Sequence, residues 1–255
     1  LCVTTAISAI PTGLPTFVQT MLSSGAQRLA REKAVVTSLA DVETLGGTTV
    51  INSDKTGTLT MNAMTSVTMI TGGSWYKIEG SGYAKSGAIL GPAGETTPDF
   101  TGLALGLALC SDATVADDES IIGDPTEAAL VVLAAKTGVD AEETRRALPR
   151  VALVPFDSEY KFMATFHDRP AHMERPLLNE PHFMTVKGAP DVVIDRCSLA
   201  LWHGEAVPMD EVRQDLLDAN QEMSERGLRV LAFAARAVSD DTMRAATDDP
   251  MGQVH

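Results

Sequence analysis

The stretch that decides the fold runs from residue 48 to residue 60 and reads TTVINSDKTGTLT. Its first part, residues 48–52, is short and rich in β-branched side chains, which predicts a buried strand. The strand should give way to a loop at Ser53 and Asp54, and Gly57 lets such a loop turn tightly. The sequence therefore predicts a carboxylate at the mouth of a strand, beside a lysine and several hydroxyl groups.

This arrangement makes Asp54 a candidate nucleophile. A strand-end carboxylate can attack the γ-phosphate of a nucleotide if cations neutralise the charge on both reactants. An isolated aspartate at a strand end often only caps a turn. The complete run of residues 54–60, following a predicted strand, favours the catalytic role.

Residues 54–60, DKTGTLT, resemble the phosphorylation signature of the cation-transporting P-type ATPases. The resemblance implies that Asp54 takes the phosphoryl group, that Lys55 balances phosphate charge and that Thr58 hydrogen-bonds the phosphoryl group. It also implies that Asp54 and the backbone carbonyl of Thr56 bind Mg²⁺. The related dehalogenase-like phosphatases carry a second aspartate at the position of Thr56, as general acid and base. Without that base, an acyl phosphate at Asp54 should persist, as a pump requires.

Two further segments resemble the nucleotide-binding domain of the same family. Residues 123–127, GDPTE, resemble an acidic loop whose glutamate, here Glu127, faces the adenine. Glu127 is also placed to close a capping box at the start of a helix. In PFDSEYKFM, residues 155–163, the resemblance implies that Phe156 stacks on adenine with Lys161 nearby. A phenylalanine at a strand end is also a common core residue.

The run KGAP, residues 187–190, predicts a small cationic pocket. It combines a lysine at a strand end, a glycine that allows close approach and a helix that begins with proline. The resemblance implies that Lys187 and Gly188 line the adenosine pocket, and that Arg229 in GLRVLAFA reaches toward the phosphates. Each charged residue alone could be a solvated strand-end cation, but their order along the chain with Asp54 favours one nucleotide site.

The N-terminal segment is uncharged over residues 1–22, a length that suits a membrane span of about 20 residues. Pro11 and Pro15 should break a helix there, as in discontinuous helices at ion paths. Residues 10–15, IPTGLP, resemble the broken fourth transmembrane helix of cation pumps, with Thr12 where many calcium-type and sodium/potassium-type members carry glutamate. The identity of the cation is therefore open. A buried soluble segment or the remains of a signal sequence are the alternatives.

Composition excludes some other classes of protein. The 20 Lys and Arg against 34 Asp and Glu leave a net charge of −14, which argues against a nucleic-acid partner. The 3 cysteines are widely spaced and odd in number, so neither a disulfide framework nor a zinc site is expected. A phosphate ligand must then be met by a few local basic side chains together with a divalent cation.

The remaining sequence predicts further helices and strands. Residues 70–97 indicate turns and short strands, and the residues after Ser239 indicate a loose tail. Helices are expected at 101–110, from Asp124 to Gly138 and around 212–223, and strands at 151–156, 161–166, 183–187 and 228–235.

The expected fold is therefore α/β, in four parts. These are a partial transmembrane helix (1–27), the start of a Rossmann-like, dehalogenase-like phosphorylation domain (28–65), an inserted nucleotide-binding domain of antiparallel sheet plus helices (66–240), and a tail or hinge (241–255) toward the rest of the phosphorylation domain. The resemblance covers the whole chain but only the middle of a typical family member, so we expect a part of a longer polypeptide.

The resemblance implies ATP-driven cation transport across a membrane through an aspartyl phosphate. ATP and Mg²⁺ would be the cofactors, and the partners would be the transported cation, the membrane and the remaining domains of the polypeptide. The soluble domains would be cytoplasmic and the membrane a bacterial plasma membrane. Two alternatives stay open: a soluble dehalogenase-like phosphatase in which residues 70–240 form a cap, and a non-catalytic nucleotide-binding module.

Overall fold

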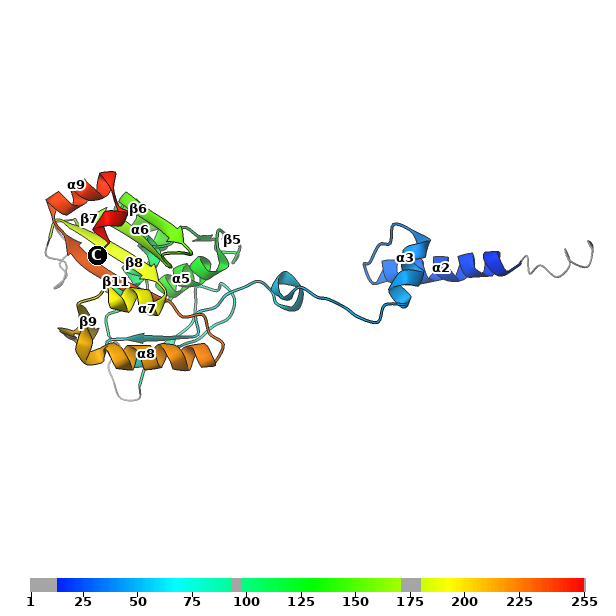
Figure 1. Ribbon diagram of the computed structural model, residues 1–255, viewed down its shortest axis with the longest axis horizontal. Coiled ribbons are helices and arrows are strands. Elements are labelled where there is room, and N and C mark those ends of the chain that lie inside the picture. The colour runs from blue at the N-terminus through cyan, green and yellow to red at the C-terminus, as the bar shows by residue number, and fades with distance from the viewer. Residues whose placement is uncertain (1–12, 93–97, 171–179, 255) are drawn as a thin grey trace, which may run out of the picture. The chain divides into compact units, whose positions relative to one another are not determined.

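The computed structural model describes residues 13–92, 98–170 and 180–254 (Figure 1). The chain divides into two compact units, Leu1–Met61 and Asn62–His255. Each unit has its own secondary structure, and the second contains all the β-sheets of the described residues.

The first unit is helical. Helix α2 (Gly13–Arg31) ends with Arg28 and Arg31 in its last turn, where basic side chains stabilise the negative end of the helix dipole. Helix α3 (Leu39–Gly46) begins at Ser38, whose hydroxyl accepts a hydrogen bond from the Ala40 amide at 3.2 Å. A single π-helical turn, η1 (Lys55–Leu59), follows Asp54 directly.

One expectation for the first unit needs correction. The strand predicted at residues 48–52 is wrong, since no strand occurs between residues 13 and 61. A β-strand requires a neighbouring strand to which its backbone can hydrogen-bond, and the described part of this unit offers none. The helix break predicted around Pro11 and Pro15 stays a prediction, because α2 begins at Gly13, the first described residue, and Pro15 lies in the first turn of the described helix. Pro11 and Thr12 lie outside the described residues. No described helix has the length and apolar character that crossing a membrane requires.

The second unit is built on a four-stranded antiparallel sheet in the order β11-β8-β7-β6. The predicted strands at 151–156, 161–166 and 183–187 are confirmed. The strand predicted at 228–235 begins four residues later, which leaves Arg229 in the preceding connection. The strands are β6 (Arg150–Asp157), β7 (Phe162–Asp168), β8 (His182–Gly188) and β11 (Ala232–Val238).

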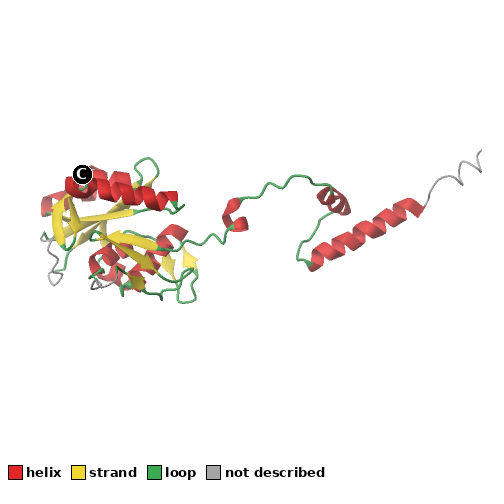
Figure 2. Ribbon diagram, turned by 90° about the horizontal axis from the view of Figure 1, so that it is seen from below, coloured by secondary structure: helices red, strands yellow, loops and turns green. Residues whose placement is uncertain are grey.

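Helices cover both faces of this sheet (Figure 2). Alternate residues of β7 point to opposite faces, and Phe162 and Phe166 pack against α7 and α9 in one core cluster. His167 points to the other face, where its ring bonds to the carbonyl of Leu148. The helices are α4 (Thr101–Leu109), α5 (Pro125–Lys136) and α6 (Ala141–Ala147) on that face, and α7 (Pro190–Asp195) and α9 (Asp240–Asp248) on the opposite one.

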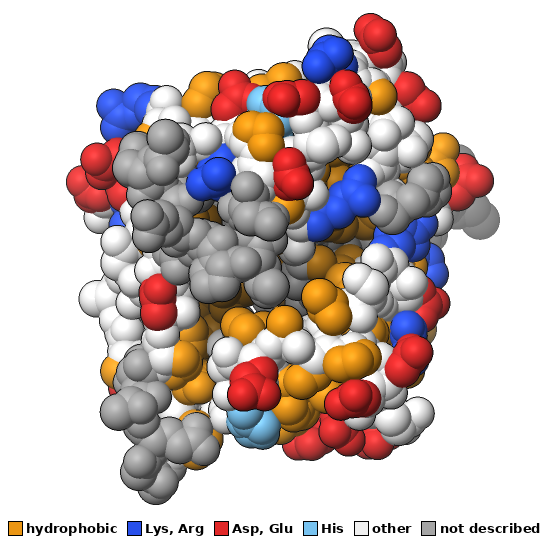
Figure 3. Space-filling model, turned by 90° about the vertical axis from the view of Figure 1, so that its left-hand side faces the viewer, with side chains coloured by type: hydrophobic (Ala, Val, Ile, Leu, Met, Phe, Trp, Pro, Cys, Tyr) orange, Lys and Arg blue, Asp and Glu red, His pale blue; other side chains and the backbone are white. Residues whose placement is uncertain are grey.

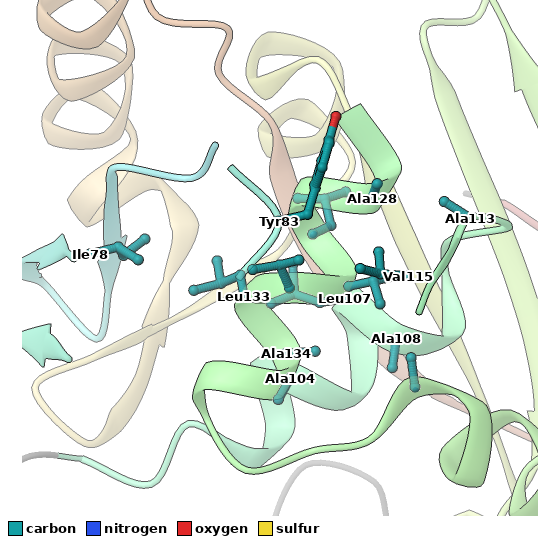
Figure 4. Close-up of a cluster of buried hydrophobic side chains, with 14 of the residues drawn as sticks. Ile78, Tyr83, Ala104, Leu107, Ala108, Ala113, Val115, Ala128, Leu133 and Ala134 are labelled. Carbon is teal, nitrogen blue, oxygen red and sulfur yellow. The ribbon is translucent and has the colours of Figure 1, made fainter. Parts of the chain in front are cut away.

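Small side chains let α4 and α5 pack closely (Figure 4). Ala104, Ala108, Ala128 and Ala134 are all completely buried. Because alanine adds little width, the two helices can approach while larger residues such as Leu107 fill the space around them. This cluster fixes the position of the first turn of α5, which carries Glu127.

Smaller elements complete the second unit, and the expected turns and short strands after residue 70 are confirmed in the described part. Three strands form a separate antiparallel sheet, and two hairpins and a long helix follow it in sequence. They are β1 (Thr68–Thr71), β2 (Ser74–Ile78), β3 (Ile89–Leu90), β4 (Thr114–Val115), β5 (Ile121–Ile122), β9 (Leu199–Trp202), β10 (Glu205–Pro208) and α8 (Met209–Glu225).

The residues after Ser239 are not loose, contrary to expectation. Ser239 caps α9 by accepting a hydrogen bond from the Thr242 amide, and Met243 and Ala246 are buried against the sheet. A short 3₁₀ turn, η2 (Met251–Gln253), follows. The apolar residues of α9 recur at a spacing of three among acidic ones, a helical pattern that the acidic composition obscured.

Candidate functional site

The central feature of the site is a buried ion pair between β8 and α5. Lys187 Nζ pairs with Glu127 Oε1, and the two side chains are 6% and 16% exposed. Charged groups this deep are costly to desolvate, and each depends on the other to offset that cost. The sequence identified both residues, and the structure brings them into direct contact from positions 60 residues apart.

The second carboxylate oxygen of Glu127 holds a backbone turn. Oε2 accepts hydrogen bonds from the amides of Asp112 and Ala113, at 2.6 and 3.2 Å. The capping box that the sequence allowed is therefore not the role of this side chain. Asp124 alone caps α5, accepting from the amides of Thr126 and Glu127 at 2.8 and 3.3 Å.

Arg229 contacts the same helix terminus, the start of α5. Its Nη1 donates to Thr126 Oγ1 at 3.0 Å, from the connection between α8 and β11. The first turn of α5 thus carries the positive end of the helix dipole with two basic side chains beside it, a combination that favours anions. Sequence analysis missed Thr126 as the partner of Arg229, because the two residues are 103 positions apart and no local pattern links them.

Gly188 allows the turn that carries Lys161 to close against β8. A Cβ atom added to Gly188 would lie 2.5 Å from Lys161 O and 2.7 Å from Phe162 Cβ. Lys161 itself has a φ of 59°, and its carbonyl accepts a hydrogen bond from the Ala189 amide at 2.9 Å. Glycine is therefore required here for a close backbone approach.

Phe156 is an exposed aromatic at the same end of the sheet. It is 58% exposed and lies in an irregularity of β6 between Val154 and Asp157. It is thus not the core residue that a phenylalanine at a strand end could have been. In the register of the sheet, Asp157 of β6 lies opposite Phe162 of β7, and Phe162 lies opposite residue 188 of β8. Residue 188 in turn lies opposite residue 232 of β11. The predicted residues Phe156, Lys161, Lys187, Gly188 and Arg229 therefore gather at one end of the sheet.

Cys110 lies beneath this site as a packing residue. It is completely buried, and its thiol donates to the Met163 carbonyl at 3.5 Å. Burial raises the pKa of the Cys110 thiol to about 11, so the sulfur stays protonated. It is therefore neither a nucleophile nor a metal ligand at neutral pH.

Charge on the molecular surface is mixed in sign. On the face drawn in Figure 3, acidic side chains lie among Lys and Arg rather than in a field of one sign. The chain as a whole carries −14, and at the start of α5 the basic side chains of Lys187 and Arg229 lie beside the carboxylates of Asp124 and Glu127.

The predicted phosphorylation residues belong to the first unit. Asp54, Lys55 and Thr58 are exposed, and Asp54 immediately precedes η1. The described residues contain no group of three or more His, Cys, Asp and Glu side chains suited to a metal ion. An exposed carboxylate still suits Mg²⁺, which commonly takes one or two carboxylates and completes its shell with phosphate oxygens and water.

Comparisons with known proteins show the family to which this chain belongs. A family described as "P-type ATPase, cytoplasmic domain N" matches residues 99–253. Cation-transporting ATPase pma1 of Synechocystis is 37% identical over 246 residues, covering 91% of this chain and 26% of that protein. Calcium-transporting ATPase lmo0841 of Listeria monocytogenes is 35% identical over 248 residues, covering 97% of this chain and 26% of that protein. Calcium-transporting ATPase 1 of Lactococcus lactis has the same identity and coverage.

The chain therefore spans about a quarter of the length of these relatives, 26% in each case. The matched family covers the sheet, its flanking helices and every residue of the candidate nucleotide site. This chain belongs to the cation-transporting P-type ATPases, and its residues 99–253 are cytoplasmic domain N.

Proposed function

We propose that this chain is the ATP-binding and phosphorylated portion of a pump that drives cations across a membrane. The observation that carries the proposal is the group formed by Glu127, Lys187 and Arg229 at the start of α5, with Phe156 exposed at the same end of the sheet. An aromatic face next to one buried and two exposed cations, Lys187, Lys161 and Arg229, suits a nucleotide, which has a planar base and a polyanionic tail.

In this proposal the adenine stacks on Phe156, and Lys187 with Gly188 lines the adenosine pocket. Glu127 faces the base while holding Lys187 and the turn at residues 112–113. Lys161 and Arg229 extend the positive region toward the phosphates. Because Lys187 is already buried and paired, the pocket is preformed, so binding costs little side-chain ordering.

The chemical step takes place at Asp54. A carboxylate oxygen of Asp54 attacks the γ-phosphorus, the bond to the bridging oxygen breaks and ADP leaves, so that an aspartyl phosphate forms. Lys55 balances the negative charge, and Thr58 hydrogen-bonds the transferred group. Asp54 and the Thr56 carbonyl would hold Mg²⁺, which supplies charge neutralisation when bound. No aspartate stands two positions after Asp54, so the phosphoenzyme should be long-lived.

The rest of the proposal concerns the whole protein. The first part, residues 1–27, would belong to a discontinuous membrane helix, and residues 28–65 would begin a Rossmann-like phosphorylation domain. The inserted nucleotide-binding domain would follow at residues 66–240, and residues 241–255 would lead back to the phosphorylation domain. The soluble domains would face the cytoplasm across a bacterial plasma membrane. The Listeria and Lactococcus relatives are named calcium-transporting, which makes calcium one candidate cation.

Phosphoenzyme formation tests the proposal. The membrane protein that contains this chain would be purified, incubated with γ-labelled ATP and Mg²⁺, and quenched in acid, beside an Asp54→Asn variant. We expect an acid-stable, hydroxylamine-sensitive label in the unmodified protein and none in the variant.

Two other results would decide against the proposal. Rapid release of phosphate without a trapped label would favour a dehalogenase-like phosphatase. ATP binding that is indifferent to Asp54→Asn, with no label in either protein, would favour a non-catalytic nucleotide-binding module.

A further inference from the structure

A pocket lined by both polar and apolar side chains lies between the end of α4, helix α6 and strands β6 and β7. Its volume is about 320 Å³, enough for a small ion with several waters. The lining residues are Ser111, Asp112, Arg145, Leu148, Pro149, Arg150 and His167.

Three buried polar atoms of this lining have no hydrogen-bond partner among the described residues: Ser111 Oγ, Arg145 Nη2 and His167 Nε2. Ser111 and His167 are completely buried. A buried polar atom without a partner costs about 1–3 kcal/mol, so three in one pocket are improbable by chance. Their convergence indicates that something polar binds among them.

The partners of the three groups define what the ligand must offer. His167 Nδ1 lies 2.9 Å from the Leu148 carbonyl, which can only accept, so Nδ1 carries the proton and Nε2 presents a lone pair. Burial lowers the pKa of His167 to about 4, so the imidazole is neutral near neutral pH. Arg145 uses Nε and Nη1 on the carbonyls of Ala108 and Ala113, at 2.9 and 3.0 Å, which leaves the Nη2 hydrogens for a ligand.

Local charge limits the ligand to a low charge. Arg150 pairs with Asp112 at 2.5 Å, and Arg145 pairs with Glu142 at 2.9 Å. The two guanidinium groups are thus balanced, and a polyanion would meet no excess of positive charge. A singly charged ligand that both accepts from Arg145 and donates to His167 fits best.

We propose that this pocket binds a small, singly charged oxyanion that carries one acidic hydrogen, such as dihydrogen phosphate. Its oxygens accept from Arg145 Nη2 and Ser111 Oγ, and its hydroxyl donates to His167 Nε2. The inference is independent of the proposed nucleotide site, because none of the three groups contacts Glu127 or Lys187. An occupant would also hold Ser111 in place, next to the Asp112 amide that Glu127 binds.

Inorganic phosphate is the probe for this pocket. The complete 255-residue chain, labelled with ¹⁵N at histidine, would be titrated with phosphate in slightly acidic solution, where phosphate carries mainly one charge. We expect a saturable change in the ¹⁵N shift of His167 Nε2. Sulfate has no hydrogen to donate, so it should bind at least about tenfold more weakly.

Variants separate this pocket from other phosphate sites. Ser111→Ala should weaken phosphate binding about tenfold, and Arg145→Lys should weaken it while retaining charge. The exposed Arg244→Gln should leave the His167 response unchanged. A His167 signal that does not respond to phosphate would overturn the proposal and leave water as the partner of the three atoms. So would equal responses to phosphate and sulfate.

Discussion

Removing Glu127 should destabilise the second unit far more than removing an exposed acid. In Glu127→Ala, Lys187 would keep its charge in a position where its side chain is 6% exposed, without a partner. Breaking a buried pair in this way typically costs about 3–5 kcal/mol. The amides of Asp112 and Ala113 would also lose their acceptor. We therefore expect the free energy of unfolding to fall by about 3–5 kcal/mol.

Urea unfolding followed by Trp75 and Trp202 fluorescence would measure this loss. The matched control is Glu142→Ala, because Glu142 also forms an ion pair, with Arg145, but its side chain is 54% exposed. It should cost no more than about 1 kcal/mol. The double variant Glu127→Ala/Lys187→Met removes the uncompensated charge and should recover part of the loss. If Glu127→Ala were no worse than Glu142→Ala, the buried pair would not be the centre of the site.

Three further predictions concern local features. Gly188→Ala should destabilise the chain by about 1–3 kcal/mol in urea unfolding, because its Cβ would meet Lys161 O at 2.5 Å; an alanine variant as stable as the original would refute the close approach. Burial lowers the pKa of His167 from 6.5 to about 4, so between these values the unfolded chain binds a proton that the folded chain does not. The free energy of unfolding should therefore fall as the pH drops through this range, by about 3 kcal/mol in full. His167→Phe should make the free energy of unfolding less dependent on pH in this range. The same pH dependence in the variant and the original chain would contradict the role of His167. Ser239→Ala should cost about 1 kcal/mol through loss of the α9 cap, measured as a lower urea midpoint, and no change would mean that the cap is dispensable.

Local signals in the sequence predicted much of the second unit. Asp124 and Pro125 marked the start of α5 because capping and proline chemistry act within one turn. The apolar runs marked β6, β7 and β8, of which β7 and β8 are almost entirely buried, whereas β6 buries only Val154. The segment at residues 48–52 had the same kind of signal and is not a strand, since a strand depends on neighbours that composition cannot reveal.

The candidate site was predictable as a set of residues but not as a set of contacts. The lysine of KGAP and the glutamate of GDPTE were visible, yet their ion pair depends on the packing of α5 against the sheet. The hydrogen bond between Arg229 and Thr126 depends on the path of the connection between α8 and β11, which carries Arg229. The pocket around His167 had no signal at all, because a histidine in an apolar strand is usually a satisfied core residue.

The most direct test of the account is ATP binding by this chain when Phe156 is replaced. Phe156→Ala removes an aromatic ring that is 58% exposed, so the fold should remain intact. The control is Leu199→Ala on β9, which removes an apolar side chain that is 51% exposed. Stacking of a base on an aromatic ring is worth about 1–3 kcal/mol, so calorimetry should show ATP affinity falling about tenfold or more in Phe156→Ala and unchanged in Leu199→Ala. Equal ATP affinity in the original chain and both variants would contradict the placement of adenine at this end of the sheet.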